Sequence, residues 1–176
     1  MPDLKSSTAA PGFDNPLDML HACHDRIMDQ CATLQKLLGH LPQHGSDVQA
    51  QQAAQAVLRY FDTAGQFHHQ DEEVDLFPLL HASGNSDAEA LIKRLLDEHQ
   101  VMDAQWSALR SQLQGIAEGA SAVLEKKLVA DFSLAYGRHV MLENTQLLPL
   151  AAQLLSQQQL AGIGKKMAER RGVSLD

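Results

Sequence analysis

Apolar residues recur along most of this chain at alternating steps of three and four, the spacing of one face of an α-helix. In the first such segment, apolar or His residues occupy positions 17, 20, 24, 27, 31, 34, 38 and 41. Asn15, Pro16 and Asp18 predict its first turn, because Asn is a favoured N-cap, proline is favoured at the first helical position and acids favour the first turn. Gly39 and Pro42 predict its end.

Three further helical segments follow, each separated from the next by turn residues. Ser46 is predicted to cap the second segment, which the sequence Ser-Gly-Asn at 83–85 ends. The capping-box spacing of Ser86–Glu89 predicts the start of the third segment. The glycines within residues 115–120 predict a loop before the fourth stripe, residues 124–147.

Four long helices joined by short loops predict an all-α fold, an antiparallel up-and-down four-helix bundle with a short C-terminal fifth helix. We expect the bundle to span residues 15–152, with residues 1–14 as a flexible N-terminal arm. Residues 153–176 are expected to form a C-terminal helix packed on or trailing the bundle. This segment starts with a capping box at Ser156 and ends in a basic run, which is interpreted as a solvated face that complements the helix C-terminus.

Length and charge restrict the class of protein. The chain has 176 residues, of which 44% are hydrophobic, and this suffices for one domain with a sizeable core. The net charge of −8 and the sequence pI of about 5.5 argue against nucleic acid or an anionic membrane as the main partner. No apolar run approaches the roughly 20 residues that cross a bilayer, and the first residues lack the apolar core of a signal peptide, so a cytoplasmic location is expected.

The two cysteines, Cys23 and Cys31, lie on one predicted helix, roughly 12 Å apart along its axis. That separation is too long for a disulfide, and no CxxC spacing supports a thiolate zinc site. Cys31 is expected to pack in the core.

Two passages place ionisable residues on the apolar stripes at the same spacings: HHQDEEVDLFPLL, residues 68–80, and HVMLENTQLLPL, residues 139–150. In each, a His is followed at +4 by Glu, at +8 by Leu, at +10 by Pro and at +11 by Leu. His24 and His99 occupy stripe positions on the other two segments. The number of residues between each of these groups and the adjoining loop gives its height along the bundle axis. By this count all of them lie at the same height to within about one turn, roughly 5 Å. The residues predicted to meet in one layer of the core are His24, His68, Glu72, His99, His139 and Glu143.

This layer predicts two metal ions. A single His on an apolar face is more often a packed, hydrogen-bonded core residue, and four unrelated core histidines are the alternative. Burying Glu72 and Glu143 without compensation, however, would cost several kcal/mol each, and the stripes offer no basic partner. A His-x-x-x-Glu pair sets both side chains on one helix face, so two such pairs and two lone His can hold two ions with the carboxylates shared. Imidazole and carboxylate without thiolate suit iron, with manganese or zinc as alternatives.

The segments HDRI, HHQDEEVDLFPLL, DEHQVMDAQW and HVMLENTQLLPL resemble the four helical signatures of the hemerythrin-like (HHE cation-binding) domain family. The resemblance covers roughly residues 15–152 and implies a non-haem di-iron site in a four-helix bundle. It implies metal-ligand roles for the six residues of the layer, with the two Glu as bridges. The family includes proteins that carry oxygen, sense oxygen or iron, or repair iron centres.

The sequence departs from the oxygen carriers of that family at two places. The carriers have His-x-x-x-His on the third helix, whereas Leu95 and Asp103 stand four residues before and after His99. Their last helix has an Asp five residues after its His, whereas Glu143 comes four residues after His139. The N-terminal cysteine domain of the repair members is not found in this sequence.

Several residues near the predicted ligands have two interpretations. His21 is expected outside the site and His69 at its flank, with metal ligation as the alternative for each. Tyr136 is expected to be a core aromatic, with donation to a bridging oxygen as the alternative, and Asp103 is a candidate acceptor for His99. The residues expected on the solvated surface or in loops are His40, His44, Asp71, Glu73, Asp75 and His81.

We therefore expect a protein that binds or reacts with dioxygen or a related small oxidant, in oxygen or redox sensing or in iron handling. Its cofactor is expected to be two iron ions with an oxo or hydroxo bridge, with zinc or manganese as substitutes. Nucleic acid and membrane are not expected partners, and the sequence does not identify a protein partner. The alternatives are a di-metal enzyme acting on peroxide or nitric oxide, and a structural zinc-binding interaction module.

Overall fold

A computed structural model describes residues 12–174, and all regular secondary structure within that range is helical. The all-α class predicted from the sequence is confirmed. The elements are α1 (Pro16–His44), α2 (Val48–Asp62), α3 (Ala64–Gln70), the π-helical η1 (Asp71–Leu76), α4 (Phe77–Ala82), α5 (Ser86–Ala117), α6 (Lys126–Leu142), the π-helical η2 (Glu143–Leu147), α7 (Leu148–Leu154) and α8 (Gln157–Arg170).

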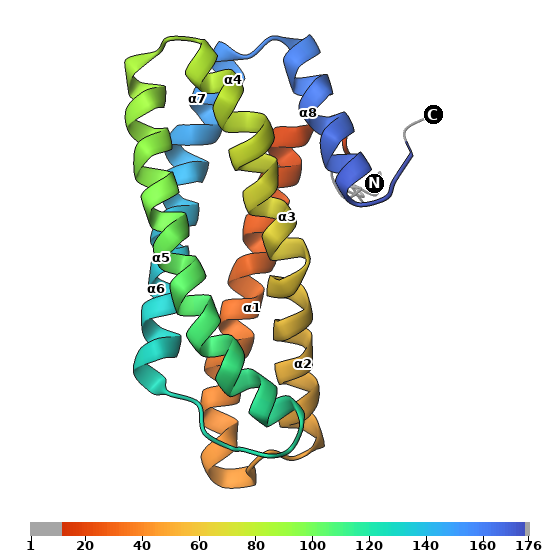
Figure 1. The fold of residues 1–176 in the computed structure, drawn as a ribbon, viewed down its shortest axis with the longest axis vertical. Coiled ribbons are helices and arrows are strands. Elements are labelled where there is room, and N and C mark those ends of the chain that lie inside the picture. Colours follow the sequence, from red (N-terminus) through yellow and green to blue (C-terminus); the bar gives the residue numbers. More distant parts are fainter. Residues whose placement is uncertain (1–11, 175–176) are drawn as a thin grey trace, which may run out of the picture.

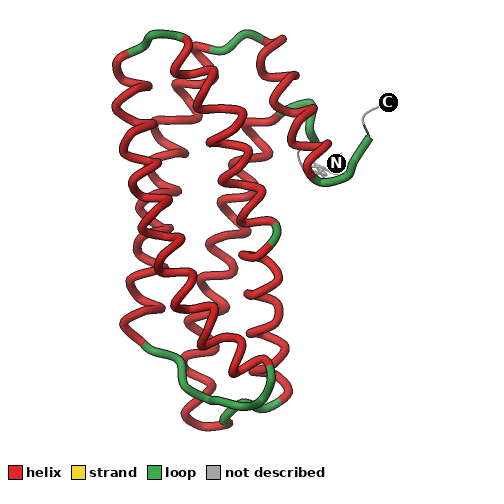
Figure 2. The backbone as a smooth tube through the Cα atoms, in the orientation of Figure 1, coloured by secondary structure: helices red, strands yellow, loops and turns green. Residues whose placement is uncertain are grey.

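The helices form columns that lie side by side along the long axis of the molecule (Figure 1). The first is α1, the second runs from α2 through α4, the third is α5 and the fourth runs from α6 through α7. α1 contacts both α2 and α6, and α5 contacts the same two helices, so the columns surround one core. The loops gather at the two ends of the columns (Figure 2). Within the described range, no helix has the length and hydrophobicity needed to cross a bilayer.

The first helix starts where predicted and ends later than predicted. The Asn15 side chain accepts a hydrogen bond from the backbone N–H of Asp18, as an N-cap does. Gly39 and Pro42 do not end α1, which continues to His44. The helix stops at Gly45, whose φ of 63° is the left-handed conformation that favours glycine at a helix end.

Two predicted N-caps are wrong by one residue. Asp47, not Ser46, caps α2 by accepting from the N–H of Ala50, while the Ser46 hydroxyl donates to the carbonyl of Ile116. Asn85 caps α5, where Ser86 was predicted. In both cases two adjacent polar residues can fill the capping role, and the sequence alone does not distinguish them.

The second and fourth columns are not regular α-helices throughout. The N–H of Phe77 bonds the carbonyl of Glu72, and the N–H of Leu148 bonds that of Glu143. Each bond spans five residues instead of four, so each column contains one widened π turn. Both π segments coincide with the repeated His-x-x-x-Glu passages.

The proline of the repeated pattern accounts for these wide turns. Pro78 and Pro149 directly follow the two N–H donors. A proline has no N–H for the carbonyl four residues earlier, and its ring collides with that carbonyl in a regular helix. Widening the preceding turn moves the carbonyl away from the ring, so the helix continues past the proline.

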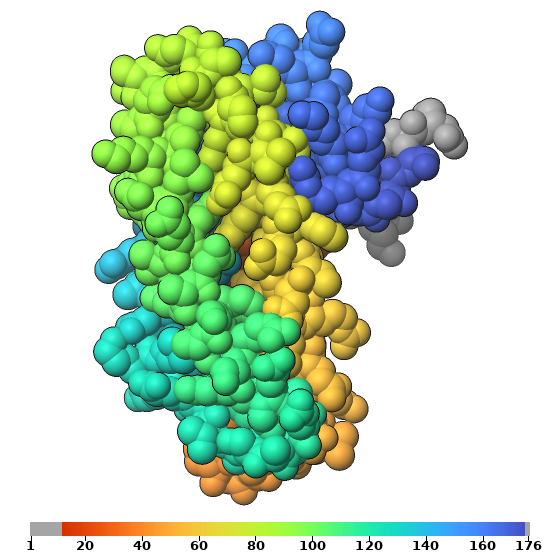
Figure 3. Space-filling view, in the orientation of Figure 1, coloured from red at the N-terminus to blue at the C-terminus, as the bar shows by residue number. Residues whose placement is uncertain are grey.

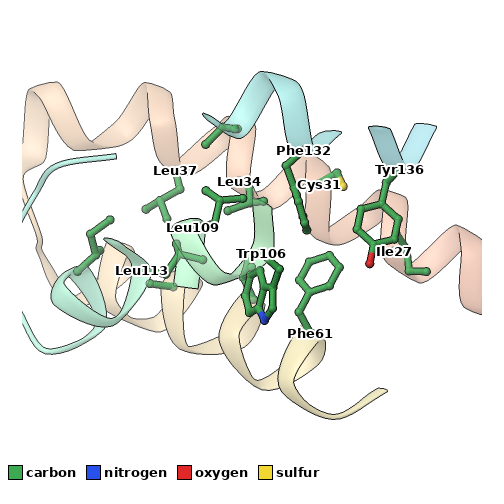
Figure 4. Close-up of a cluster of buried hydrophobic side chains, with 14 of the residues drawn as sticks. Ile27, Cys31, Leu34, Leu37, Phe61, Trp106, Leu109, Leu113, Phe132 and Tyr136 are labelled. Carbon is green, nitrogen blue, oxygen red and sulfur yellow. The ribbon is translucent and has the colours of Figure 1, made fainter. Parts of the chain in front are cut away.

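Apolar side chains form two separate core clusters. The first core cluster (Figure 4) includes Ile27, Cys31, Leu34, Phe61, Met102, Trp106, Leu113, Phe132 and Tyr136. The second core cluster includes Leu20, Leu76, Leu80, Leu95, Leu142, Leu147 and Met167. Each fully buried large apolar side chain contributes about 1.5–3 kcal/mol to folding. Cys23 and Cys31 are both buried free thiols, so the prediction that they do not form a disulfide is confirmed.

The predicted polar layer lies between these two clusters. On α1, His24 stands between Leu20 of the second core cluster and Ile27 of the first. On α5, His99 stands between Leu95 of the second core cluster and Met102 of the first. A layer of ionisable groups therefore divides the hydrophobic core in two.

The last helix, α8, packs back on the columns. Its capping box at Ser156 is confirmed, and it contacts α1 and η1. Figure 3 shows it against the segment that contains α3 and η1. The interpretation of its basic run as a solvated face is wrong for Arg170 and Arg171, whose side chains are only 16% and 17% exposed. Residues 1–11 of the predicted N-terminal arm lie outside the described residues.

Candidate metal centre

The structure brings all six predicted side chains together in the polar layer. They come from six elements, α1, α3, η1, α5, α6 and η2, and none is more than 2% exposed. Their ligand atoms form two groups of four, within each of which all ligand atoms lie within 4.8 Å of one another. The first group is His24, His68, Glu72 and Glu143, and the second group is Glu72, His99, His139 and Glu143. Each group thus has two imidazoles of its own, and both carboxylates belong to both groups.

The two oxygens of Glu72 face different groups. Oε1 lies 3.2 Å from Nε2 of His68 in the first group, and Oε2 lies 3.3 Å from Nε2 of His99 in the second. Glu72 itself lies within the π turn of η1. The carboxylate therefore lies across the middle of the layer.

Glu143 repeats this arrangement from the opposite column. Its Oε2 lies 2.9 Å from Nε2 of His24, and its Oε1 lies 3.1 Å from Nε2 of His139. A carboxylate with one oxygen toward each of two imidazole pairs has the geometry of a bridge between two ions.

Three of the four histidines make a hydrogen bond with the nitrogen that points away from the layer. Because each partner atom is an acceptor oxygen, Nδ1 donates a proton to it, and Nε2 is the atom that faces inward and can bind a metal when it is deprotonated. This orientation is typical of metal-binding histidines. The pairs are His24 Nδ1 to Asn144 Oδ1 at 2.6 Å, His99 Nδ1 to Glu73 Oε1 at 2.6 Å, and His139 Nδ1 to Glu98 Oε2 at 2.8 Å.

The inward atoms fit cations better than they fit one another. Among the described residues, both nitrogens of His68, Nε2 of His24 and all four oxygens of Glu72 and Glu143 have no aligned hydrogen-bond partner. The 2.9 Å contact between His24 and Glu143 is close but lacks hydrogen-bond geometry. Buried polar atoms without partners are costly, and metal ions between them would satisfy them together. The donor set therefore fits two bound ions.

The comparison with known proteins agrees with this geometry. The family described as hemerythrin HHE cation binding domain matches residues 15–151, most of the chain. This chain belongs to the hemerythrin HHE family. A Haemophilus influenzae protein described as an uncharacterised protein is 32% identical to it over 161 residues, which cover 92% of each chain.

Protons and metals compete for the imidazoles of this hemerythrin HHE domain. Burial lowers the pKa of His24, but the nearby carboxylates of Glu143 and Glu72 favour the charged imidazole, outweigh burial and raise that pKa to about 10. Burial likewise opposes the charged form of His99, yet Glu72 raises its pKa to about 9. Burial holds the pKa of His68 well below the usual range. In the metal-free protein at neutral pH, His24 and His99 therefore carry protons that offset the two carboxylates.

Metal binding is expected to release about two protons per chain at pH 7, because the ligands must be neutral imidazoles. The raised pKa values set the direction of the pH dependence. Apparent metal affinity should rise as pH increases from 7 through about 9 and 10, where the competing protons leave, and fall below pH 7. Calorimetric titration with metal in buffers of different ionisation enthalpy measures the proton count. A pH-independent affinity with no proton release would contradict this account.

Two nearby histidines stand outside both groups of donors. His21 is 55% exposed and lies 4.0 Å from Asp25, so the structure does not bring it to the site. His69 is buried, and its ring stacks on that of His99 with centroids 4.0 Å apart. Its Nε2 lies 3.4 Å from the hydroxyl of Tyr136, a member of the first core cluster. Burial, together with His99, lowers the pKa of His69 to about 3, so this ring is neutral.

The outer partners of the histidines were largely missed by sequence reasoning. Glu73 lies on the surface as expected, with its side chain 41% exposed, but its carboxylate also accepts from His99, the role considered for Asp103. Asp103 is 61% exposed and lies nearest His69, at 3.8 Å. Glu98 and Asn144 were not singled out, although each directly adjoins a predicted ligand. Adjacency is a weak signal, because the neighbour of an inward residue can point either way.

Unlike Glu73, Asp71 and Asp75 are not on the surface where they were expected, so that prediction is wrong for both. Their exposed fractions are 0% and 2%. Both form ion pairs with the arginines of the C-terminal helix, which are distant in sequence. No local pattern could have indicated that pairing.

Proposed function

We propose that this hemerythrin HHE protein binds two iron ions between its two groups of donors and reacts there with dioxygen or a related small oxidant. The observation that carries the proposal is the pair of buried carboxylates that each face both imidazole pairs. The proposed ligands are His24, His68, Glu72, His99, His139 and Glu143. Imidazole and carboxylate donors suit iron among the common metals.

Each part of the chain has a definite role in this proposal. When bound, the irons would supply electrons to the oxidant. The outer partners Asn144, Glu73 and Glu98 hold the imidazole rings with Nε2 inward. The four columns, which we propose form an antiparallel four-helix bundle, hold the six donors in one layer. Because the donors are 0–2% exposed, the site favours small oxidants over larger substrates.

The biological role that we propose for the site is oxygen or redox sensing, or iron handling. The decisive experiment is metal analysis with an absorption spectrum, on protein produced in iron-replete cells. Two irons per chain and near-ultraviolet charge-transfer absorption that changes on reduction would support the proposal. Colourless protein with stoichiometric zinc and no redox response would overturn it in favour of a structural zinc site.

Air is expected to oxidise the ferrous protein within minutes, in a change that argon does not reverse. Only four histidines are proposed ligands. The oxygen carriers have a further histidine on the third helix, and one of the two equivalent positions here is Leu95, which is fully buried in the second core cluster. Anionic carboxylates stabilise the more positive ferric ions, so net oxidation is favoured over reversible uptake. Stopped-flow absorption after mixing with air, followed by argon, measures this. Restoration of the ferrous spectrum by argon after hours in air would show the opposite behaviour.

A further inference from the structure

A pair of buried acids lies directly beside a proposed metal ligand. Asp71 and Asp75 are one turn apart in η1, and Asp71 immediately precedes Glu72. The two aspartates share one face of the column, and Glu72 points from another face into the metal layer. Since both aspartates are at most 2% exposed, the fold requires cations to be brought to them.

The cations come from the end of α8. Arg170 pairs with Asp71 and also places its Nη2 2.7 Å from Oδ2 of Asp75. The Nη2 of Arg171 lies 2.7 Å from Asp71 Oδ2, and its Nη1 lies 3.2 Å from Asp71 Oδ1, a two-point contact that fixes both position and orientation. Lys166 Nζ lies 3.3 Å from Asp75 Oδ1. These five side chains make a continuous network between η1 and the end of α8.

Arg171 contacts the residues that precede two proposed ligands. Besides pairing with Asp71, its guanidinium lies 5.6 Å from the centre of the Phe67 ring, within cation–π range. Phe67 precedes His68, just as Asp71 precedes Glu72. Phe67 and Asp71 are four residues apart and share the outer face of the column, so contacts made there set the rotation of the inner face.

α8 is itself firmly seated, which makes it a usable anchor. Its Met167 is fully buried in the second core cluster, and the Met167 carbonyl accepts a hydrogen bond from Arg171 at 3.0 Å. The backbone carbonyl of Phe13 lies so close to Gly164 that a side chain there would collide with it. The contacts at Met167 and Gly164 therefore hold α8 in place in addition to the ion pairs between its arginines and η1.

We propose that Arg170 and Arg171 are positioning residues, which hold η1 and the end of α3 in the rotation that turns His68 and Glu72 into the metal layer. The inference rests on the proposed metal site. A π turn has poorer hydrogen-bond geometry than an α turn, so η1 depends on contacts from outside its own backbone. Because Glu72 belongs to both groups of donors, movement of η1 disturbs both ions.

The test uses cobalt(II) as the probe, because its visible spectrum reports coordination geometry. The variants are Arg171→Met, Arg170→Met and the conservative Arg171→Lys. The matched control is Lys165→Met on the same helix, whose side chain is 72% exposed and pairs with Glu169. We expect Arg171→Met and Arg170→Met to alter the cobalt spectrum and to speed cobalt release to a chelator at least about tenfold. Arg171→Lys should fall between these variants and wild type, and Lys165→Met should match wild type.

A second control separates positioning from a general loss of stability. Leu113→Ala removes a buried side chain of the first core cluster, away from α8, and should lower the melting temperature while leaving the cobalt spectrum and release rate unchanged. Amide hydrogen exchange of the metal-free proteins gives a readout without metal, and Arg171→Met should speed exchange selectively at residues 68–77. Should Arg171→Met fail to fold, Arg171→Lys carries the same comparisons.

The outcomes distinguish this inference from the proposed function. Wild-type protein that takes up no cobalt or iron would overturn the metal site, and selective exchange at residues 68–77 would then still decide the role of the arginines. Cobalt-loaded arginine variants with the wild-type spectrum and release rate would overturn the positioning role. So would effects that match those of Leu113→Ala at equal loss of melting temperature.

Discussion

Glu72→Gln is expected to reduce bound metal from two ions per chain to nearly none, whereas His24→Ala should leave about one. Glu72 contributes an oxygen to both groups of donors, so its loss weakens both ions at once. Glutamine keeps the shape but removes the negative charge and leaves a single carbonyl oxygen as a donor. His24 belongs to the first group alone, so the second group keeps its four donors when it is removed.

Metal analysis of the purified variants by mass spectrometry measures these occupancies. Glu143→Gln should behave as Glu72→Gln does, because it occupies the equivalent place in the other column. Glu89→Gln is the matched control, since Glu89 is a surface residue, 44% exposed, that pairs with His81. Retention of two ions by Glu72→Gln would exclude a shared carboxylate, and equal losses in the Glu72 and His24 variants would exclude two distinct groups.

Removing the metals is expected to lower the melting temperature by about 8–16 °C. Free metal at a thousand times its dissociation constant stabilises the folded state by about 4 kcal/mol, and for a chain of this size each kcal/mol corresponds to about 2–4 °C. Without ions, the layer between the two core clusters holds six ionisable side chains, and the inward atoms of His24, His68, Glu72 and Glu143 lack aligned partners. Removing the metals should therefore destabilise the packing of both core clusters.

Differential scanning calorimetry of the metal-loaded protein, with and without prior chelation, checks the shift. The same treatment of Glu72→Gln supplies the control, because chelation should not change the melting temperature of a variant that binds no metal. Identical melting temperatures for the loaded and metal-free wild type would mean that the six side chains do not depend on ions for their burial.

The parts of the fold that could be predicted are those that follow from helix geometry. A constant rise of 1.5 Å per residue and short loops let residue counts stand for heights, so His24, His68, His99 and His139 could be placed in one layer. The same regularity made the π turns invisible, because a widened turn is a departure from it. In retrospect the proline ten residues after each His was their signal, and its physical reason is the missing N–H.

The parts that could not be predicted depend on contacts between distant segments. The neighbours of Asp71 in the sequence predict a surface residue. Its burial is stabilised by the ion pair with Arg170, which lies on another helix and approaches Asp71 only in the folded chain. The outer partner of His139 comes from α5, and that of His99 comes from η1. Helix spacing shows which residues face the core, but it does not show which polar side chain from a neighbouring column will reach them.

The sharing of Glu143 has a consequence for how the protein is made. Residues 16–82 supply two imidazoles and one carboxylate to the first group of donors, and the fourth donor is Glu143, near the end of the last column. A ribosome that has completed only the first two columns therefore carries a chain without a finished site for either ion. Tight metal binding is therefore expected only after residue 143 has left the ribosome and packed, which makes metal uptake one of the last steps of maturation and links the first two columns to the last.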